Sequence, residues 1–256
     1  MVKAPILQEG IDRNLWVWEQ PNYDKQYIVV ADVSRGDGSD YSACQVFEIE
    51  DMTQCAEYKG KLSTTDYGHF LIDLATKYND ALLVVENNNI GWATIQTIID
   101  RGYKNLFYQS KDLKYVDVEH QINNRYRTQD RNMVAGFSMT MKTRPLVIAK
   151  LEEYFREKSV IVHSDRLIDE LFVFIWHNNR AEAMEGYNDD LAMSLAIGLW
   201  VRDTALRLNA EGIALQKTVL NKMLDYEAVY TPTDNRNDEW AMETGNTRED
   251  LTWLIK

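Results

Sequence analysis

The fold is decided by the stretch from Tyr27 to Asp40, which reads YIVVADVSRGDGSD. Its first half is a continuous run of apolar, mostly β-branched residues, which is typical of a central strand covered on both faces. The run ends at Asp32, and the SRGDGS sequence that follows predicts a turn. A carboxylate just inside a hydrophobic strand is costly unless something pairs with it. Asp32 is therefore either the cap of this turn or a ligand for a cation, and on its own the cap is the simpler interpretation.

The residues around this strand predict an antiparallel meander. A second apolar run at residues 42–49 follows at hairpin distance, and a third strand is expected at residues 54–61. On the N-terminal side, Trp16 and Trp18 flank Val17 and predict a short edge strand. After the meander, the caps of residues 63–66 and the apolar spacing of residues 70–78 predict a helix.

The next segment repeats the pattern of a buried strand that ends in an acid. Residues 81–86, ALLVVE, predict a strand that ends at Glu86, and three asparagines then turn the chain. A helix is expected at residues 91–100 and a short strand at residues 106–108. Alternating strands and helices after a meander predict an α/β fold with a mixed central sheet, in which antiparallel and parallel strands are flanked by helices.

The C-terminal half is predicted to be mainly helical. We expect helices at residues 146–158, 165–176 and 191–201, with a short strand at residues 160–162. Trp92, Trp176 and Trp200 are expected in the core. A further helix at residues 213–226 precedes a polar, acidic tail, so the expected domains are residues 1–205 and an appendage of residues 206–256.

Composition restricts the class of protein. The chain has 256 residues, of which 45% are hydrophobic and 27% charged, which is ordinary for a soluble globular protein. No run approaches the roughly 18 apolar residues of a membrane span, and no signal peptide is evident, so we expect a cytoplasmic protein with reduced Cys44 and Cys55. The net charge of −12 argues against non-specific coating of nucleic acid.

Acids recur where a site is expected. Asp32 and Glu86 end two predicted strands, and Asp189 and Asp190 open a predicted helix. If the two strands are parallel neighbours, both acids lie at the sheet edge where open α/β sheets place their sites. Two-metal phosphoryl chemistry uses such carboxylates, and oxygen ligands without His or Cys favour Mg²⁺ or Mn²⁺ over Zn²⁺.

Three motifs carry a specific resemblance. VADVSRGDGSDYSA at residues 30–43, VVENNNIG at 84–91 and NDDLAMSL at 188–195 resemble the nuclease domain of the large terminase subunit of T4-like tailed bacteriophages. GFSMT at residues 136–140 and the Thr143-Arg144 pair resemble the segment between that family's second and third acids. The match runs from about Trp16 to Val201, with the acids in the same order.

The resemblance implies a ribonuclease H-like fold and an endonuclease that cuts concatemeric double-stranded viral DNA during packaging, with two Mg²⁺ or Mn²⁺ ions. Position by position, Asp32 matches the first acid, Glu86 the second, and the Asp189-Asp190 pair the third. We favour Asp190 as the primary ligand of that pair and keep Asp189 as a second ligand or an orienting group. Asp40 matches an aspartate after the first loop, where a metal ligand and a simple turn residue are about equally expected.

The resemblance also implies partners. These are double-stranded DNA, the ATPase portion of the same subunit, the portal protein and the small terminase subunit, in the host cell cytoplasm. The chain contains no G-x-x-x-x-G-K-[ST] loop, so it corresponds to the nuclease portion, and translocation is not expected of it.

Residues 110–144 have a charge balance opposite to that of the whole chain. Basic residues outnumber acids there, and we expect this segment to contact the DNA backbone. The alternative is a solvated loop whose charges pair with the protein's own surface. The residues concerned are Arg125, Arg127, Arg131, Lys142 and Arg144.

Two other functions also fit the sequence. One is a resolvase- or transposase-like nuclease that uses the same acids on branched or specific DNA. The other is a non-catalytic module that docks on the portal or the motor, which the acidic tail and net charge also fit. A docking module would tolerate loss of the acids, and a resolvase would prefer junctions to linear duplex.

Overall fold

The computed structural model describes residues 2–10, 12–35, 41–110, 133–177 and 180–203, together with the backbone of two strands near the C-terminus. The chain forms two units, residues 1–209 and residues 210–256. In the second unit, β11 (Ala241–Thr244) pairs antiparallel with β12 (Thr247–Asp250). The first unit holds the remaining strands and every helix in the described part of the chain.

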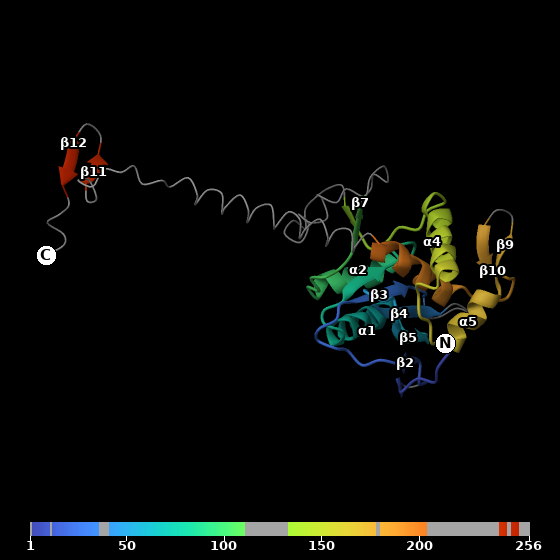
Figure 1. The fold of residues 1–256 in the computed structure, drawn as a ribbon. Helices are drawn as coiled ribbons and strands as arrows, with labels where there is room; N and C mark the ends of the chain where they lie inside the picture. Colours follow the sequence, from blue (N-terminus) through green and yellow to red (C-terminus); the bar gives the residue numbers. More distant parts are fainter. Residues whose placement is uncertain are drawn as a thin grey trace. The chain divides into compact units, whose positions relative to one another are not determined.

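A six-stranded mixed sheet forms the centre of the first unit, in the order β1-β2-β5-β4-β3-β6 (Figure 1). All neighbours are antiparallel except β3 and β6, which are parallel. The mixed sheet predicted from the sequence is therefore confirmed. The strands are β1 (Leu7–Glu9), β2 (Leu15–Val17), β3 (Tyr27–Asp32), β4 (Ser42–Glu48), β5 (Gln54–Gly60) and β6 (Leu82–Val85).

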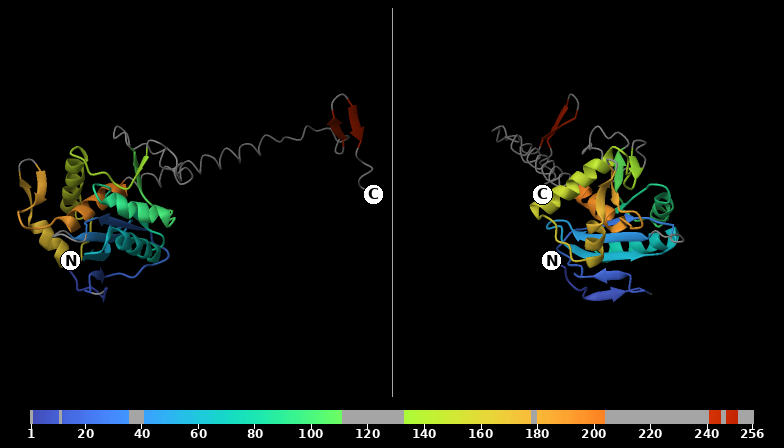
Figure 2. Two further views of the ribbon diagram at one scale, coloured as in Figure 1. Left: turned by 180° about the vertical axis from the view of Figure 1, so that it is seen from behind. Right: turned by 90° about the vertical axis from the view of Figure 1, so that its right-hand side faces the viewer.

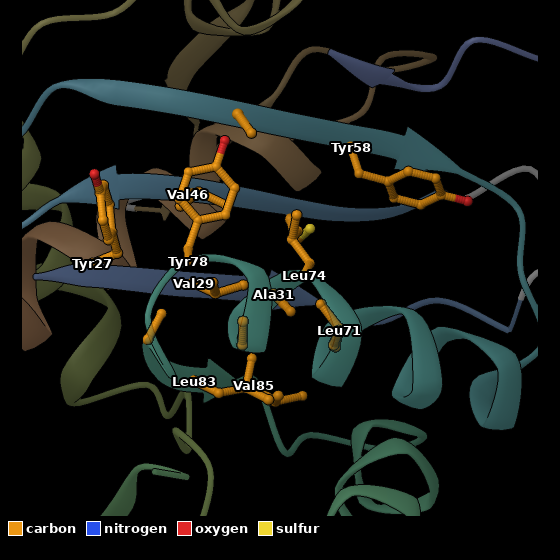
Figure 3. Packing of buried hydrophobic residues seen from close by; sticks show 14 of the residues in the cluster. Tyr27, Val29, Ala31, Val46, Tyr58, Leu71, Leu74, Tyr78, Leu83 and Val85 are labelled. Carbon is orange, nitrogen blue, oxygen red and sulfur yellow. The ribbon is translucent and has the colours of Figure 1, made fainter. Parts of the chain in front are cut away.

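The strand β3 alternates its side chains between two hydrophobic layers, which explains its uninterrupted apolar run. Val29 and Ala31 face a cluster that includes buried residues of α1 (Thr64–Lys77) and α2 (Gly91–Asp100). Figure 3 shows Leu71 and Leu74 of α1 meeting side chains of β3, β4 and β6 in this layer.

The opposite face of the sheet carries the second layer. Ile28 and Val30 pack there with buried residues of α4 (Thr143–Glu157), α5 (Asp165–Phe172) and a helix formed by residues 190–203. Because side chains alternate along a strand, Asp32 lies on this same face, two residues after Val30. The sheet is thus covered on both sides, as its continuous apolar strands predict.

Beyond β6, the sheet edge is shared by two short segments. Phe107 donates to the Leu83 carbonyl at 2.8 Å, and Phe137 donates to the Val85 carbonyl at 2.8 Å. Phe137 thereby forms an isolated parallel bridge with Glu86. These segments adjoin β7 (Tyr108–Ser110) and β8 (Met133–Ala135), which pair antiparallel.

The structure corrects three sequence expectations. The helix expected at residues 165–176 ends at Phe172, because Phe174–His177 pairs antiparallel with Arg180–Ala183 as the hairpin β9–β10. This hairpin lies at the outer side of α4 and α5 (Figures 1 and 2). Trp176 and Trp92 are not core residues, since 62% and 48% of their surfaces are exposed. The strand expected at residues 160–162 is reduced to one bridge, between Ile161 and Thr53.

Two further observations concern the class of protein. No helix in the described part of the chain is both long enough and apolar enough to span a bilayer. Cys44 and Cys55 are free and buried, and burial raises the pKa of each thiol to about 12.

Candidate active site

The register of two parallel strands brings Asp32 and Glu86 to the same level. Ala31 pairs with Val85, and the Glu86 amide donates to the Ala31 carbonyl at 2.9 Å. Asp32 and Glu86 are the next residues on their strands, and both side chains lie on the face of the 190–203 helix. The two half-buried carboxylates therefore stand side by side at the carboxyl ends of β3 and β6.

The third acid position comes from the start of the 190–203 helix. Oδ2 of Asp190 is buried and has no hydrogen-bond partner, while a hydrogen bond from the Tyr41 backbone reaches its carboxylate. Burial raises the pKa of Asp190 to about 7, and the charge of Glu170 adds to this rise. An unpartnered carboxylate oxygen in such a position fits a cation ligand better than a structural acid.

Electrostatics show that these acids share one environment. Burial raises the pKa of Asp32 well above its usual range, and the charges of Glu86, Asp190 and Asp189 raise it further. Burial also raises the pKa of Glu86. Carboxylates crowded in this way repel each other unless protons or cations neutralise them.

Two neighbouring polar side chains hold the acids in place. The Asn88 amide donates to Glu86 Oε1 at 2.7 Å and to the Met139 carbonyl at 2.9 Å. The Arg144 guanidinium donates to Asp189 Oδ2 at 3.0 Å and twice to the Ala181 carbonyl, at 2.8 and 3.1 Å. The charge of Arg144 also lowers the pKa of Glu86 and so opposes the effect of burial.

Glycines let the backbone close around Glu86. A Cβ atom on Gly91 would lie 1.9 Å from the Glu86 carbonyl oxygen. Gly136 has a φ of +79°, and a Cβ atom there would lie 2.5 Å from the Val85 carbonyl oxygen. Both glycines belong to the motifs quoted from the sequence, and the close approach of backbone explains why these positions need them.

Sequence reasoning missed two functional candidates, Lys59 and Glu170. Glu170 forms a buried ion pair with Lys59 and accepts hydrogen bonds from the Leu191 and Ala192 amides, at 2.7 and 3.1 Å. The charge of Lys59 lowers the pKa of Asp190, and that of Glu170 raises it. The sequence gives little indication of this ion pair. Lys59 lies within a predicted strand and Glu170 within a predicted helix, and neither residue belongs to a motif.

The donor set fits a hard divalent cation, because it consists only of carboxylate oxygens and includes the unpartnered oxygen of Asp190. As the side chains stand, no three His, Cys, Asp or Glu residues within the described ranges converge closely enough to hold an ion. The charges of Glu86, Asp189 and Asp190 all raise the pKa of Asp32, but the four side chains do not surround a common point. Binding one ion with these acids would therefore require movements of their side chains.

The other predicted site residues are placed as follows. Asp40, Arg125, Arg127 and Arg131 lie outside the described residues. Lys142 is exposed at the start of α4, whereas Arg144 is bound to Asp189 and Ala181. Whether any of these residues contacts DNA stays a prediction.

Solved structures share this architecture. The large terminase nuclease from thermophilic phage G20c with bound cobalt matches with a TM-score of 0.58 at 19% identity, over 78% of this chain and 92% of that chain. The chain has the fold of a large terminase nuclease. The G20c nuclease with bound magnesium matches with a TM-score of 0.57 at 18% identity, over the same shares, 78% and 92%. The large terminase nuclease domain of Thermus phage P74-26 matches with a TM-score of 0.51 at 19% identity, over 77% of this chain and 88% of that chain.

The resemblance to large terminase nucleases that the sequence motifs predict is thus confirmed at the level of fold. No family model matches the chain. In this chain the parallel pairing of β3 and β6 places their carboxyl ends together, with Asp32 and Glu86 at those ends.

Proposed function

We propose that this chain is a metal-dependent DNA endonuclease that cuts concatemeric double-stranded viral DNA during genome packaging. One observation carries the proposal. Asp32 and Glu86 stand side by side at the ends of two parallel strands, near Asp190 with its unpartnered Oδ2 atom, in the fold of large terminase nucleases.

We assign Asp32, Glu86 and Asp190 as the residues that would hold divalent cations, with Asp189 as a further ligand or an orienting group. The oxygen-only donor set favours Mg²⁺ or Mn²⁺, and we propose two ions. When bound, such ions supply Lewis acidity and charge neutralisation at a scissile phosphate. The bound magnesium and cobalt of the G20c terminase nuclease support a divalent cation here.

The chain's own groups hold and orient the acids. Asn88 fixes the Glu86 carboxylate by donating to Oε1, and Arg144 fixes Asp189 while it neutralises part of the negative charge. The raised pKa of Asp190, about 7, means that protons compete with cations for this carboxylate near neutral pH. Cation binding and proton release are therefore coupled at this residue.

The biological setting follows from the same proposal. Residues 1–205 would form the nuclease domain, with residues 206–256 as an appendage. The domain would act on double-stranded DNA in the host cell cytoplasm, together with an ATPase portion of the same terminase subunit, the portal protein and the small terminase subunit. Translocation of DNA is assigned to the ATPase portion.

The experiment is a cleavage assay with the full 256-residue chain on linear duplex and on a four-way junction. We expect cleavage of duplex with Mg²⁺ and Mn²⁺, little with Ca²⁺ and none in chelator. Strong preference for the junction would replace the proposal by a resolvase-like activity. No cleavage under any metal condition would favour the non-catalytic docking module.

A further inference from the structure

The 190–203 helix begins in an unusual way. Its first helical hydrogen bond runs from the Met193 amide to the Asp189 carbonyl at 2.8 Å, which makes Asp189 the N-cap residue. An aspartate at this position commonly turns its carboxylate back to accept from the second or third amide of the helix. Here the Asp189 carboxylate instead binds Arg144, at 3.0 Å. The amides of the first turn therefore need an acceptor from elsewhere.

Glu170 of α5 supplies that acceptor. Its Oε2 atom accepts from the Leu191 amide at 2.7 Å and from the Ala192 amide at 3.1 Å. These are the second and third amides of the helix, the ones that an N-cap side chain normally binds. The other oxygen of Glu170 pairs with Lys59, and the residue is only 6% exposed.

A second polar side chain holds the same turn from the sheet. The Gln45 amide, on β4, donates to the Leu191 carbonyl at 2.6 Å and to the Ser194 hydroxyl at 2.9 Å. The first turn is thus bound at its amides by Glu170 and at a carbonyl by Gln45. Both contacts fix the backbone that carries Asp189 and Asp190.

We propose that Glu170 is a positioning residue that caps the 190–203 helix in place of Asp189. It thereby keeps the Asp190 carboxylate and the Asp189 carboxylate, which is paired with Arg144, out of the cap and at the proposed cation site. The metal consequence rests on the proposed function, whereas the cap itself is a property of the fold. Neither Glu170 nor Lys59 is among the residues that we assign as metal ligands.

A buried ion pair is a costly way to cap a helix. Moving the Glu170 and Lys59 charges out of water carries a desolvation cost that a local aspartate cap would avoid. That cost is understandable if the local aspartate has another task. Without Glu170, the positive end of the helix would attract the carboxylate of the N-cap residue Asp189 and compete with Arg144 for it.

The test compares two double variants that differ only in the cap acceptor. Lys59→Met/Glu170→Gln removes both charges but keeps an amide oxygen that can accept from Leu191 and Ala192. Lys59→Met/Glu170→Met removes the charges and the acceptor at similar volume, a replacement that buried ion pairs often tolerate. Three properties are measured on the full chain: amide hydrogen exchange at Leu191 and Ala192, Mn²⁺ affinity by electron paramagnetic resonance without DNA, and the kcat and KM of cleavage.

We expect Lys59→Met/Glu170→Gln to keep amide exchange protection and Mn²⁺ affinity within about threefold of the parent. Lys59→Met/Glu170→Met should lose exchange protection at both amides and bind Mn²⁺ about 10–100-fold more weakly, which is the loss typical when a group that orients metal ligands is removed. Its kcat should fall with KM little changed. Either result with equal Mn²⁺ affinity in the two variants would overturn the positioning role. Affinity unchanged from the parent would mean that neither the charges nor the cap matter, and an equal loss would assign the effect to charge.

A single substitution tests the cap independently of those variants. Asp189→Ala should leave the protection of the Leu191 and Ala192 amides within about threefold, because Asp189 is not their acceptor. A loss of more than tenfold would overturn the cap. If the parent chain binds Mn²⁺ but cuts no DNA, the proposed function fails, and the exchange and Mn²⁺ measurements still decide the role of Glu170.

Discussion

Arg144 and Asp189 form an ion pair in which Nη2 of the arginine lies 3.0 Å from Oδ2 of the aspartate. The same guanidinium binds the Ala181 carbonyl of β10, so it connects the start of α4 to the hairpin and to the residue before the 190–203 helix. Only 17% of the arginine side chain is exposed. The structure therefore pairs Arg144, which the sequence predicts as a DNA contact, with Asp189, one of the clustered acids.

The first prediction concerns this ion pair. Arg144→Gln removes three hydrogen bonds from a mostly buried site, so the free energy of unfolding should fall by about 1–3 kcal/mol. Lys142→Gln is the matched control, because Lys142 is exposed two residues earlier and should change stability by less than about 0.5 kcal/mol. Urea denaturation measures both, and equal effects would contradict the structural role of Arg144.

The second prediction separates backbone strain from steric clash at two glycines. Gly136 and Gly186 have similar φ values, +79° and +86°, but only at Gly136 would a Cβ atom meet other atoms within 4 Å. Gly186→Ala should cost about 1 kcal/mol for the left-handed conformation alone. Gly136→Ala should cost about 3 kcal/mol or more, because the Val85 carbonyl and Ile95 must move. Thermal unfolding compares them, and equal losses would show that the contact beside Glu86 is unimportant.

The third prediction follows from the pKa of Asp190, which burial raises to about 7. In the unfolded chain an aspartate titrates near 3.9, so the folded state binds this proton more tightly. The resulting stabilisation is fully present below about pH 4 and is lost as the pH rises through about 7. In chelator, Asp190→Asn should therefore be more stable than the parent at pH 8 by about 1–3 kcal/mol, a figure reduced because the side chain is half-exposed.

At pH 4 most of the advantage of Asp190→Asn should disappear, because the parent carboxyl is then protonated in the folded state and about half protonated in the unfolded state. Urea denaturation at pH 4, 6 and 8 without divalent ions measures this difference. Parallel stability curves for parent and variant would contradict the raised pKa.

The fourth prediction tests the basic segment. Neutralising Arg125, Arg127 and Arg131 together should weaken duplex binding at low salt and reduce the log–log salt slope by roughly 0.9 for each phosphate that is no longer neutralised. The loss should be similar for every DNA sequence, since phosphate contacts do not read bases. Fluorescence anisotropy at several salt concentrations measures it. An unchanged affinity and slope would move the DNA-binding surface elsewhere.

The central sheet could be predicted because its physical signal is local. Residues 28–31 and 82–85 are apolar runs that must be covered on both faces, and they do form β3 and β6. The hairpin β9–β10 could not be predicted, because Phe174 and Trp176 continue the apolar spacing of the preceding helix. Only their pairing with residues 180–183 identifies the segment as a strand. β1 was missed because Leu7-Gln8-Glu9 has almost no apolar pattern.

The residues of the candidate site likewise differ in whether the sequence alone could identify them. Asp32 and Glu86 were recognisable because a carboxylate at the end of a buried strand is locally anomalous. Glu170 and Lys59 carry no such anomaly, and their importance depends on an ion pair between residues far apart in the chain. Sequence motifs located the acids, whereas the groups that hold them depend on tertiary contacts.

The fifth prediction is that Asp32→Asn abolishes cleavage while the protein stays folded. The substitution keeps shape and hydrogen bonding but removes a charge that a divalent cation requires, and it relieves repulsion among crowded carboxylates, so stability without metal should not fall. Asp73→Asn, on the exposed side of α1, is the control that should keep full activity.

The most direct measurement is therefore the rate of linear-duplex cleavage in Mg²⁺ by the parent chain, Asp32→Asn and Asp73→Asn. The proposed site predicts rapid cleavage by the parent and Asp73→Asn, and a loss of at least about 10³-fold for Asp32→Asn with an unchanged circular dichroism spectrum. Cleavage by Asp32→Asn within a few-fold of the parent would contradict the assignment of these acids as the metal-binding site.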